Sequence, residues 1–230
     1  NQSLTGENNS RTGVDEITGG AGNNLIIGGS EFDDIIFAHN ADGTIADSSN
    51  AVLGDNGVIE FDAANGNAVT FMRSDFSADD RSDEIKLGKG NNFIIGGHGT
   101  DFIDVGSFSF PDPGRGTNII VGDSGQIDLI SDFNPEVGFA ESFVRSNTLD
   151  SSDRITVDNF SSKSLVLGGS GDDTINLRSG DHAILGDHGT ISFDATTLEA
   201  IFLNGKSTDT DGNDRITPKA GNVRVTAVLG

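Results

Sequence analysis

Short clusters of apolar residues recur along the chain, and each ends in a pair of glycines. The first is Leu25-Ile-Ile-Gly-Gly29, and similar clusters occupy residues 93–97 and 165–169. Glycine adopts positive φ values without steric cost, so glycines at fixed spacing mark similar tight turns. Apolar runs of this length between glycine-rich turns predict short β-strands. We therefore expect an all-β chain made of many short strands and turns.

A period of nine residues underlies these clusters. In the frames 10–18, 19–27 and 28–36, the sixth position is polar and the eighth is isoleucine. The residues concerned are Asp15, Asn24 and Asp33 with Ile17, Ile26 and Ile35, and in the next copy Asp83, Asn92 and Asp101 with Ile85, Ile94 and Ile103. We interpret each frame as a turn of about six residues followed by a strand with one inward apolar residue. Nine residues then form half a coil, and eighteen return the chain to the same edge one layer on.

Longer units contain these frames. The segment Asp15-Glu-Ile17 is matched at residues 83–85, 153–155 and 214–216. The predicted organisation is the tail of a preceding repeat (1–14), three repeat units (15–82, 83–152 and 153–213) and the start of a truncated fourth unit (214–230). Repetition on this scale is typical of solenoids, in which each unit stacks on its neighbours. We expect the array to extend in both directions in the full protein.

Each unit also contains a Gly-Asp-x-Gly segment that is followed by two apolar stretches. An Asn-Gly pair at residues 65–66 separates the first two stretches, and such a pair between apolar runs predicts a β-hairpin. The predicted hairpins pair Val58–Phe61 with Val69–Met72, Gln126–Ile130 with Phe139–Val144, and Thr190–Phe193 with Ala200–Leu203. Two further insertions, Ala38–Asn50 and Gly106–Thr117, are expected to be loops that project from the edge opposite the aspartates.

Charge and composition indicate that the chain needs cations. It has 36 acidic and 14 basic residues, and its formal net charge is −22. Such a surface repels nucleic acid and anionic membranes. Cysteine is absent, so disulfides cannot cross-link the chain. No apolar run approaches the roughly 18 residues that a membrane span requires. Bound ions are therefore the obvious candidate for holding the acidic segments together.

Two nonapeptides have the form Gly-Gly-x-Gly-x-Asp-x-U-x, in which U is a large apolar residue. They are Gly96–Asp104 and Gly168–Asn176, while residues 19–27 differ by Asn24 and residues 28–36 by Glu31. The chain therefore resembles the RTX, or hemolysin-type, calcium-binding repeat family. The resemblance implies a right-handed parallel β-roll with Ca²⁺ in its turns. The long units look like those of large repetitive bacterial proteins that are secreted or surface-attached.

Aspartates that recur once per coil are the candidate calcium ligands, because they should lie on the same edge in successive coils. Ca²⁺ takes about six to eight oxygen ligands, which carboxylates and the carbonyls of tight glycine turns can supply. A lone aspartate in such a turn more often bonds its own backbone, but the pairing, the charge and the absent cysteines favour an ion. The candidates are the pairs Asp15 with Asp33, Asp83 with Asp101 and Asp153 with Asp173, then Asp55, Asp123 and Asp187 one coil later, and the turn glycines Gly20, Gly22, Gly97, Gly99, Gly169 and Gly171.

The opposite edge carries neutral polar residues at the same position of the frame. Asn24 and Asn92 occupy it, and Ser162 and His182 stand at equivalent places. Asparagine offers a neutral oxygen and closes turns in the left-handed region. We therefore expect ions along the acidic edge and few ions along this neutral edge.

Other site chemistry fits the sequence less well. A zinc site needs a defined ligand set, but cysteine is absent, and His98 and His188 occupy variable turn positions. Ser170 lies within a repeat and lacks the pattern of a nucleophile elbow. Carboxylates that recur in three units are unlike an active site, which is normally single. We therefore expect that the chain is not an enzyme.

The sequence favours a structural role for the chain. We expect a calcium-stabilised segment of an extracellular or cell-surface bacterial protein of the adhesin, filament or surface-layer type. Its expected partners are calcium and neighbouring repeats or copies of the same chain. Two alternatives stay open: a calcium-dependent secretion or folding module of a secreted enzyme or toxin, and a polysaccharide-binding module that uses the inserted loops.

Overall fold

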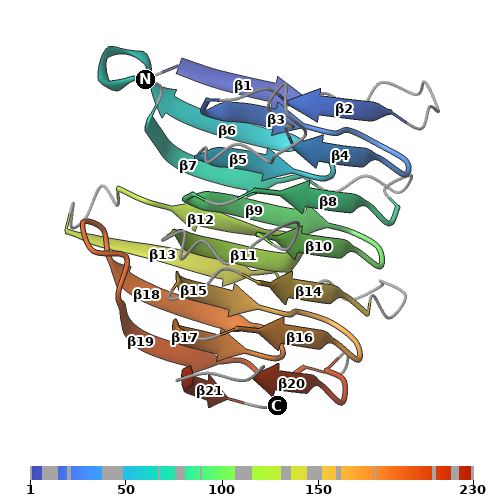
Figure 1. Ribbon diagram of the computed structural model, residues 1–230, viewed down its shortest axis with the longest axis vertical. Coiled ribbons are helices and arrows are strands. Elements are labelled where there is room, and N and C mark those ends of the chain that lie inside the picture. The colour runs from blue at the N-terminus through green and yellow to red at the C-terminus, as the bar shows by residue number, and fades with distance from the viewer. Residues whose placement is uncertain are drawn as a thin grey trace.

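The computed structural model consists of three stacked β-sheets. It describes residues 2–6, 15–19, 22–37, 49–66, 68–75, 81–88, 90–106, 116–130, 136–143, 152–158, 162–178, 180–208, 211–218 and 223–228. Within these residues each sheet has seven strands. The strands lie across the long axis of the molecule, with the N-terminal strands at one end and the C-terminal strands at the other (Figure 1).

Two of the sheets are parallel throughout. The outer sheet contains β2 (Glu16–Gly19), β4 (Asp34–Phe37), β8 (Glu84–Leu87), β10 (Phe102–Val105), β14 (Arg154–Val157), β16 (Thr174–Leu177) and β20 (Arg215–Pro218). The central sheet contains β3 (Asn24–Ile27), β5 (Asn50–Leu53), β9 (Asn92–Gly97), β11 (Thr117–Asp123), β15 (Ser162–Leu167), β17 (Gly180–Leu185) and β21 (Val223–Val228). The chain alternates between these two sheets, apart from the segments that form the third.

The third sheet, here called the hairpin sheet, is antiparallel. It contains β1 (Gln2–Gly6), β6 (Gly57–Asp62), β7 (Ala68–Ser74), β12 (Gly125–Asp128), β13 (Val137–Ser142), β18 (Gly189–Asp194) and β19 (Ala200–Gly205). The all-β prediction is confirmed, but the chain is not a single parallel solenoid. The reason is that the hairpins are not isolated from one another. Neighbouring hairpins pair through β7–β12 and β13–β18 and form a continuous sheet.

The strand register agrees with the predicted coil. Ile17 pairs with Ile35, and Ile85 pairs with Ile103, each eighteen residues further along the chain. In the third unit the same pairing joins Ile155 to residue 175, twenty residues on, because one half-coil is longer. The isoleucine at the eighth position of every second frame therefore returns to the same row of the outer sheet, while those of the frames between, Ile26 and Ile94, lie in the central sheet. This alternation confirms the nine-residue half-coil.

The central sheet separates two apolar cores. Its inward side chains at Val52, Ile94 and Ile120 pack against the outer sheet. The adjacent residues Ile119 and Val121 face the other way and pack against the hairpin sheet. A parallel strand that is covered on both faces reads as a continuous apolar run, which explains the apolar clusters of the sequence.

The three predicted hairpins are present as β6–β7, β12–β13 and β18–β19. In the first, the Asp62 side chain accepts a hydrogen bond from the N–H of Ala64 and begins the 3-10 turn η1 (Ala63–Asn65). Gly66 ends that turn at φ 64°, in the left-handed region that glycine adopts readily. The Asn-Gly signal therefore located the turn correctly.

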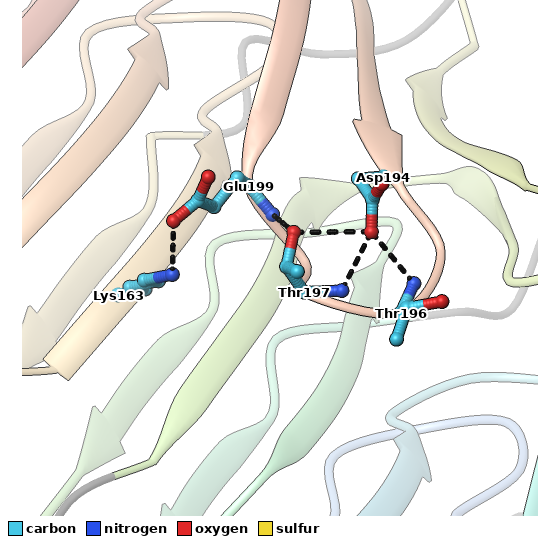
Figure 2. Close-up of polar contacts among 5 residues, drawn as sticks. All are labelled: Lys163, Asp194, Thr196, Thr197 and Glu199. Carbon is cyan, nitrogen blue, oxygen red and sulfur yellow. Dashed lines mark hydrogen bonds and ion pairs between the residues drawn. The ribbon is translucent and has the colours of Figure 1, made fainter.

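Side chains hold the tip of the third hairpin. Asp194 accepts hydrogen bonds from the N–H groups of Thr197 and Thr196 at 2.7 and 2.9 Å (Figure 2). The hydrogen bond from the Thr197 backbone is the main reason that the pKa of Asp194 is lowered. Beside it, Glu199 accepts from the Lys163 ammonium at 2.6 Å, which ties the hairpin to β15 of the central sheet.

Because the central sheet is buried on both faces, substitutions of two consecutive residues should both be costly. Ile119 and Ile120 are fully buried in opposite cores, and we expect either one, changed to alanine, to lower the free energy of unfolding by about 2–5 kcal/mol. Ile130 is 54% exposed and provides the control, for which we expect a loss below about 0.5 kcal/mol. Urea denaturation measures all three, and a near-neutral Ile119→Ala would contradict the two-core arrangement.

Candidate cation-binding edge

One aspartate immediately precedes every strand of the outer sheet. These residues form a column along one edge of the stack, which we call the aspartate ladder. Its members are Asp15, Asp33, Asp83, Asp101, Asp153, Asp173 and Asp214. The ladder follows from the nine-residue frame, because strands in register place the residues before them in register as well.

Hydrogen bonds join consecutive members of the ladder. From Asp33 onward, the Oδ1 of each carboxylate accepts from the backbone N–H of the ladder residue before it, at N···O distances from 2.7 to 3.1 Å. The three predicted pairs are neighbours in this column. The same bond also crosses between units, as from the N–H of Asp33 to Asp83 at 2.8 Å.

The second carboxylate oxygen, Oδ2, does not take part in these hydrogen bonds along the ladder. The Oδ2 atoms of Asp33, Asp101, Asp153 and Asp173 are buried and make no hydrogen bond within the described part of the chain. These four side chains are at most 2% exposed. A buried charge without a partner is costly, so this row of oxygens calls for a cation or for protons.

A column of glycines faces these oxygens. A Cβ on any of Gly28, Gly54, Gly96, Gly122, Gly168 or Gly186 would collide with the Oδ2 of a ladder aspartate. For the first five of these glycines the same Cβ would also collide with the carbonyl oxygen of the next glycine in the column. Only glycine therefore allows carboxylate and carbonyl oxygens to approach the same point.

Asp55, Asp123 and Asp187 form a second acidic row beside the ladder. Each is at most 5% exposed. Their carboxylates accept from backbone N–H groups of a following turn, Asp55 from residue 98, Asp123 from Ser170 and Asp187 from Gly212. The two rows lie close enough for Asp123 to act electrostatically on Asp101, Asp153 and Asp173.

The sequence suggested that these three residues continue the ladder by one coil. The structure shows that they do not. Asp123 aligns in register with Gly97, the second glycine of a Gly-Gly pair. The chain leaves the edge for a hairpin after each Gly-Asp-x-Gly segment, and the residue that returns takes the next place in the ladder. For this reason Asp83 stacks on Asp33, and Asp214 rather than Asp187 stacks on Asp173.

Burial raises the pKa of several ladder carboxylates. It raises the pKa of Asp33 to about 6, that of Asp101 to about 8 and that of Asp173 to about 9. For Asp153 burial, followed by the charges of neighbouring aspartates, raises the pKa well above its ordinary value. The charges that act on the last three residues all belong to other aspartates, so at neutral pH the ladder favours bound protons or a cation in their place.

The donor set suits a hard cation. Within the described part of the chain, no three His, Asp or Glu side chains converge into a cage that could hold a metal alone. A metal at this edge would therefore need backbone oxygens too, and the glycine column supplies them. Oxygen-only sites of mixed carboxylate and carbonyl groups match calcium and differ from the nitrogen and sulfur sets of zinc.

The glycines predicted as carbonyl donors fall in different places. Gly97, Gly99, Gly169 and Gly171 lie in acidic-edge turns and have positive φ values between 88° and 129°. Gly22 lies at the other edge, where its carbonyl accepts from Asn24 at 2.8 Å, so the structure does not bring it to the ladder. Gly20 lies outside the described residues, as do residues 38–48 and 107–115 of the two predicted loops.

Sequence reasoning missed the first glycine of each Gly-Gly or Gly-Asp pair. These residues, Gly54, Gly96, Gly122, Gly168 and Gly186, are the ones whose carbonyl oxygens lie at the ladder. It also missed Asp214 as a ladder member. The signal was present, because each of these glycines ends an apolar cluster of the central sheet and Asp214 begins a matched segment.

The neutral edge has a ladder of its own. The Nδ2 of Asn24 donates to Asn50, that of Asn50 to Asn92 and that of Asn92 to Asn118, at 2.8, 2.9 and 3.0 Å. Asn50 and Asn118 were not predicted, because insertions precede them and break the frame. The next places belong to Ser164 and His182. Ser162 was predicted there wrongly, since it pairs with Gly180 two residues away.

Comparison with known protein families gives a match that overlaps the acidic edge. The model of the RTX calcium-binding nonapeptide repeat (4 copies) matches residues 11–44, 77–109 and 165–187. Neither the curated proteins nor the solved structures yield a match. The matched segments contain the acidic-edge turns that lead into β4, β10 and β16, together with the ladder residues Asp33, Asp101 and Asp173.

The raised pKa values predict an unusual pH dependence for the metal-free protein. Protons stabilise the fold fully below the ordinary aspartate pKa of 3.8, and this stability is lost as pH rises through about 6 to 9. Thermal unfolding in chelator should therefore give a midpoint that falls from pH 4 to about pH 9. Excess calcium should flatten the profile above pH 6, whereas a metal-free midpoint that rises over this range would contradict the assignment.

Proposed function

Because the chain carries RTX calcium-binding nonapeptide repeats, we propose that it is a calcium-stabilised structural segment of an extracellular bacterial repeat protein. The type that we propose is an adhesin, a filament or a surface layer. One observation carries the proposal: the ladder buries a row of carboxylates whose Oδ2 atoms face glycine carbonyls. The residues that would hold calcium are those of the ladder and of the second acidic row.

Calcium would make folding of the chain depend on the calcium concentration of the compartment. Burial and, after it, the charges of neighbouring aspartates raise the pKa of Asp153, so without an ion its charged form is costly to bury. Bound calcium would supply positive charge beside the buried carboxylates of the ladder. Binding to the native state alone stabilises it by mass action, and folding free energy then includes the binding free energy. The chain would thus stay unfolded at low calcium and fold where calcium is abundant.

The ends of the outer sheet favour stacking of further repeats or copies. At one end β2 presents Glu16 and Ile17, and at the other β20 presents Arg215 and Ile216. Glu16 and Arg215 are exposed, and both isoleucines are only partly buried against the core. A strand with the sequence of β2, added beside β20 in the register of the sheet, would place opposite charges side by side and cover the core.

A structural role is also favoured over catalysis. Ser170 Oγ lies 3.0 Å from His188 Nε2, a contact that could suggest a nucleophile and a base. Both residues are at most 4% exposed, and the other histidine nitrogen faces Ser142. We interpret this cluster as packing between a central-sheet turn and the hairpin sheet.

An extracellular location belongs to the same proposal. RTX repeats are typical of secreted bacterial proteins, and the strongly acidic composition suits a calcium-rich exterior. Among the described residues, no helix has the length and apolar character that crossing a membrane requires. A calcium-dependent secretion or folding module is the second candidate, and the inserted loops leave polysaccharide binding as a third.

Asp153→Asn separates the hydrogen bond that a ladder carboxylate accepts from the negative charge that it carries. The amide keeps an Oδ1 acceptor for the N–H of Asp101 but removes a charge. We expect the variant to melt at the same or a higher temperature than the parent in chelator. Calcium should raise the melting temperature of the parent. In millimolar calcium this rise should be smaller for the variant by about 5–10 °C, as expected for one lost site.

Asp181→Asn is the matched control, because Asp181 is exposed on β17 beside His182, at the neutral edge. Its calcium response should equal that of the parent. Circular dichroism with a calcium titration follows both variants. A folded β spectrum of the parent that is indifferent to chelator at pH 8 would overturn the proposal.

Charge reversal at the sheet ends tests the filament role against the module role. If copies stack through β20 and β2, calcium should promote self-association in analytical ultracentrifugation. Arg215→Glu should then weaken association about two- to fivefold, and the double variant with Glu16→Arg should restore it. Monomeric behaviour in calcium at all concentrations would favour a secretion or folding module.

A further inference from the structure

The asparagine ladder of the neutral edge stops abruptly at Asn118. The next strand places Ser164 in register with it, and the strand after that places His182 in register with Ser164. Serine is one heavy atom shorter than asparagine and has no amide. The amide oxygen that accepts in the other rungs is therefore absent, and the shorter serine hydroxyl makes no hydrogen bond with the Nδ2 of Asn118.

Among the residues that the structure describes, three buried polar atoms are left without hydrogen bonds at this break. They are the Nδ2 of Asn118, the Oγ of Ser164 and the Nδ1 of His182. The exposed fractions of these residues are 0%, 0% and 4%. A buried polar atom that stays unsatisfied costs about 1–3 kcal/mol, and three in consecutive rungs are unusual in a native fold.

The orientation of each group is fixed by its other contacts. The Oδ1 of Asn118 accepts from Asn92, so its Nδ2 donors point toward Ser164. The Nε2 of His182 lies 2.9 Å from the carbonyl oxygen of Arg178. A carbonyl only accepts, so Nε2 carries the hydrogen, and burial lowers the pKa of His182 and keeps the ring neutral. Its Nδ1 is therefore an acceptor.

We propose that an ordered water molecule occupies this break and completes the ladder. The water accepts from the Nδ2 of Asn118, donates to the Nδ1 of His182 and exchanges a hydrogen bond with the hydroxyl of Ser164. Buried waters commonly make about three hydrogen bonds to groups that are otherwise unsatisfied. A cation is disfavoured here, because the N–H donors of Asn118 face the site. The site does not depend on the proposed calcium function.

A high-resolution crystal structure and ¹⁷O water relaxation dispersion test this site directly in the parent protein. We expect one well-ordered water within hydrogen-bond distance of all three atoms and a corresponding long-lived water in solution. Absence of density between these atoms, or density with the coordination of a metal ion, would overturn the proposal.

Ser164→Asn provides the decisive variant. Its Oδ1 should accept from Asn118 and its Nδ2 should donate to the Nδ1 of His182, so the ladder becomes continuous. We expect one long-lived water fewer and a melting temperature higher by about 2–4 °C. An unchanged water count in a folded variant would contradict the site.

Ser164→Ala keeps the proposal testable if the asparagine variant does not fold. It removes one of the three partners and leaves room for the water. We expect the long-lived water to remain and the melting temperature to fall by about 2–4 °C. If Ser164→Ala left the melting temperature unchanged, the Ser164 hydroxyl would not be hydrogen-bonded to a water, and the proposal would fail.

Discussion

The buried column of aspartates is the constraint on which the rest of the structure depends. Each ladder carboxylate uses Oδ1 to bind the backbone of its neighbour and leaves Oδ2 facing the glycine column. The first contact fixes the register of the outer sheet. The second concentrates negative charge in a place that water does not reach. The coils can therefore stack only if that charge is neutralised, and under the proposed function calcium would neutralise it.

The two edges show how the same geometry serves different chemistry. Both place one polar residue per coil in register, and in both that residue bonds the next rung. Asparagine carries its own donor and acceptor, so Asn24, Asn50 and Asn92 satisfy one another without an ion. An aspartate carboxylate carries acceptors only, so among the described residues the buried Oδ2 atoms of Asp33, Asp101, Asp153 and Asp173 receive no hydrogen bond. The choice between Asn and Asp thus decides which edge needs a cation.

Much of this arrangement could be predicted from the sequence, because a fixed period places residues without knowledge of tertiary contacts. The nine-residue frame located the ladder pairs, and Asn65-Gly66 located a hairpin. Contacts set by insertions could not be predicted in this way. Asp55 left the ladder because a hairpin follows it, Asn118 joined the neutral ladder after an insertion, and the hairpins paired into a sheet through contacts between units that no local pattern records.

The most direct test of this account is a crystal structure of the calcium-loaded protein, with anomalous scattering to identify the ions. The account predicts calcium peaks along the acidic edge, each within coordination distance of a ladder Oδ2 such as those of Asp101, Asp153 and Asp173, and of a glycine carbonyl. Ions along the asparagine ladder with none beside the aspartates, or a folded protein without ions at either edge at pH 8, would contradict it.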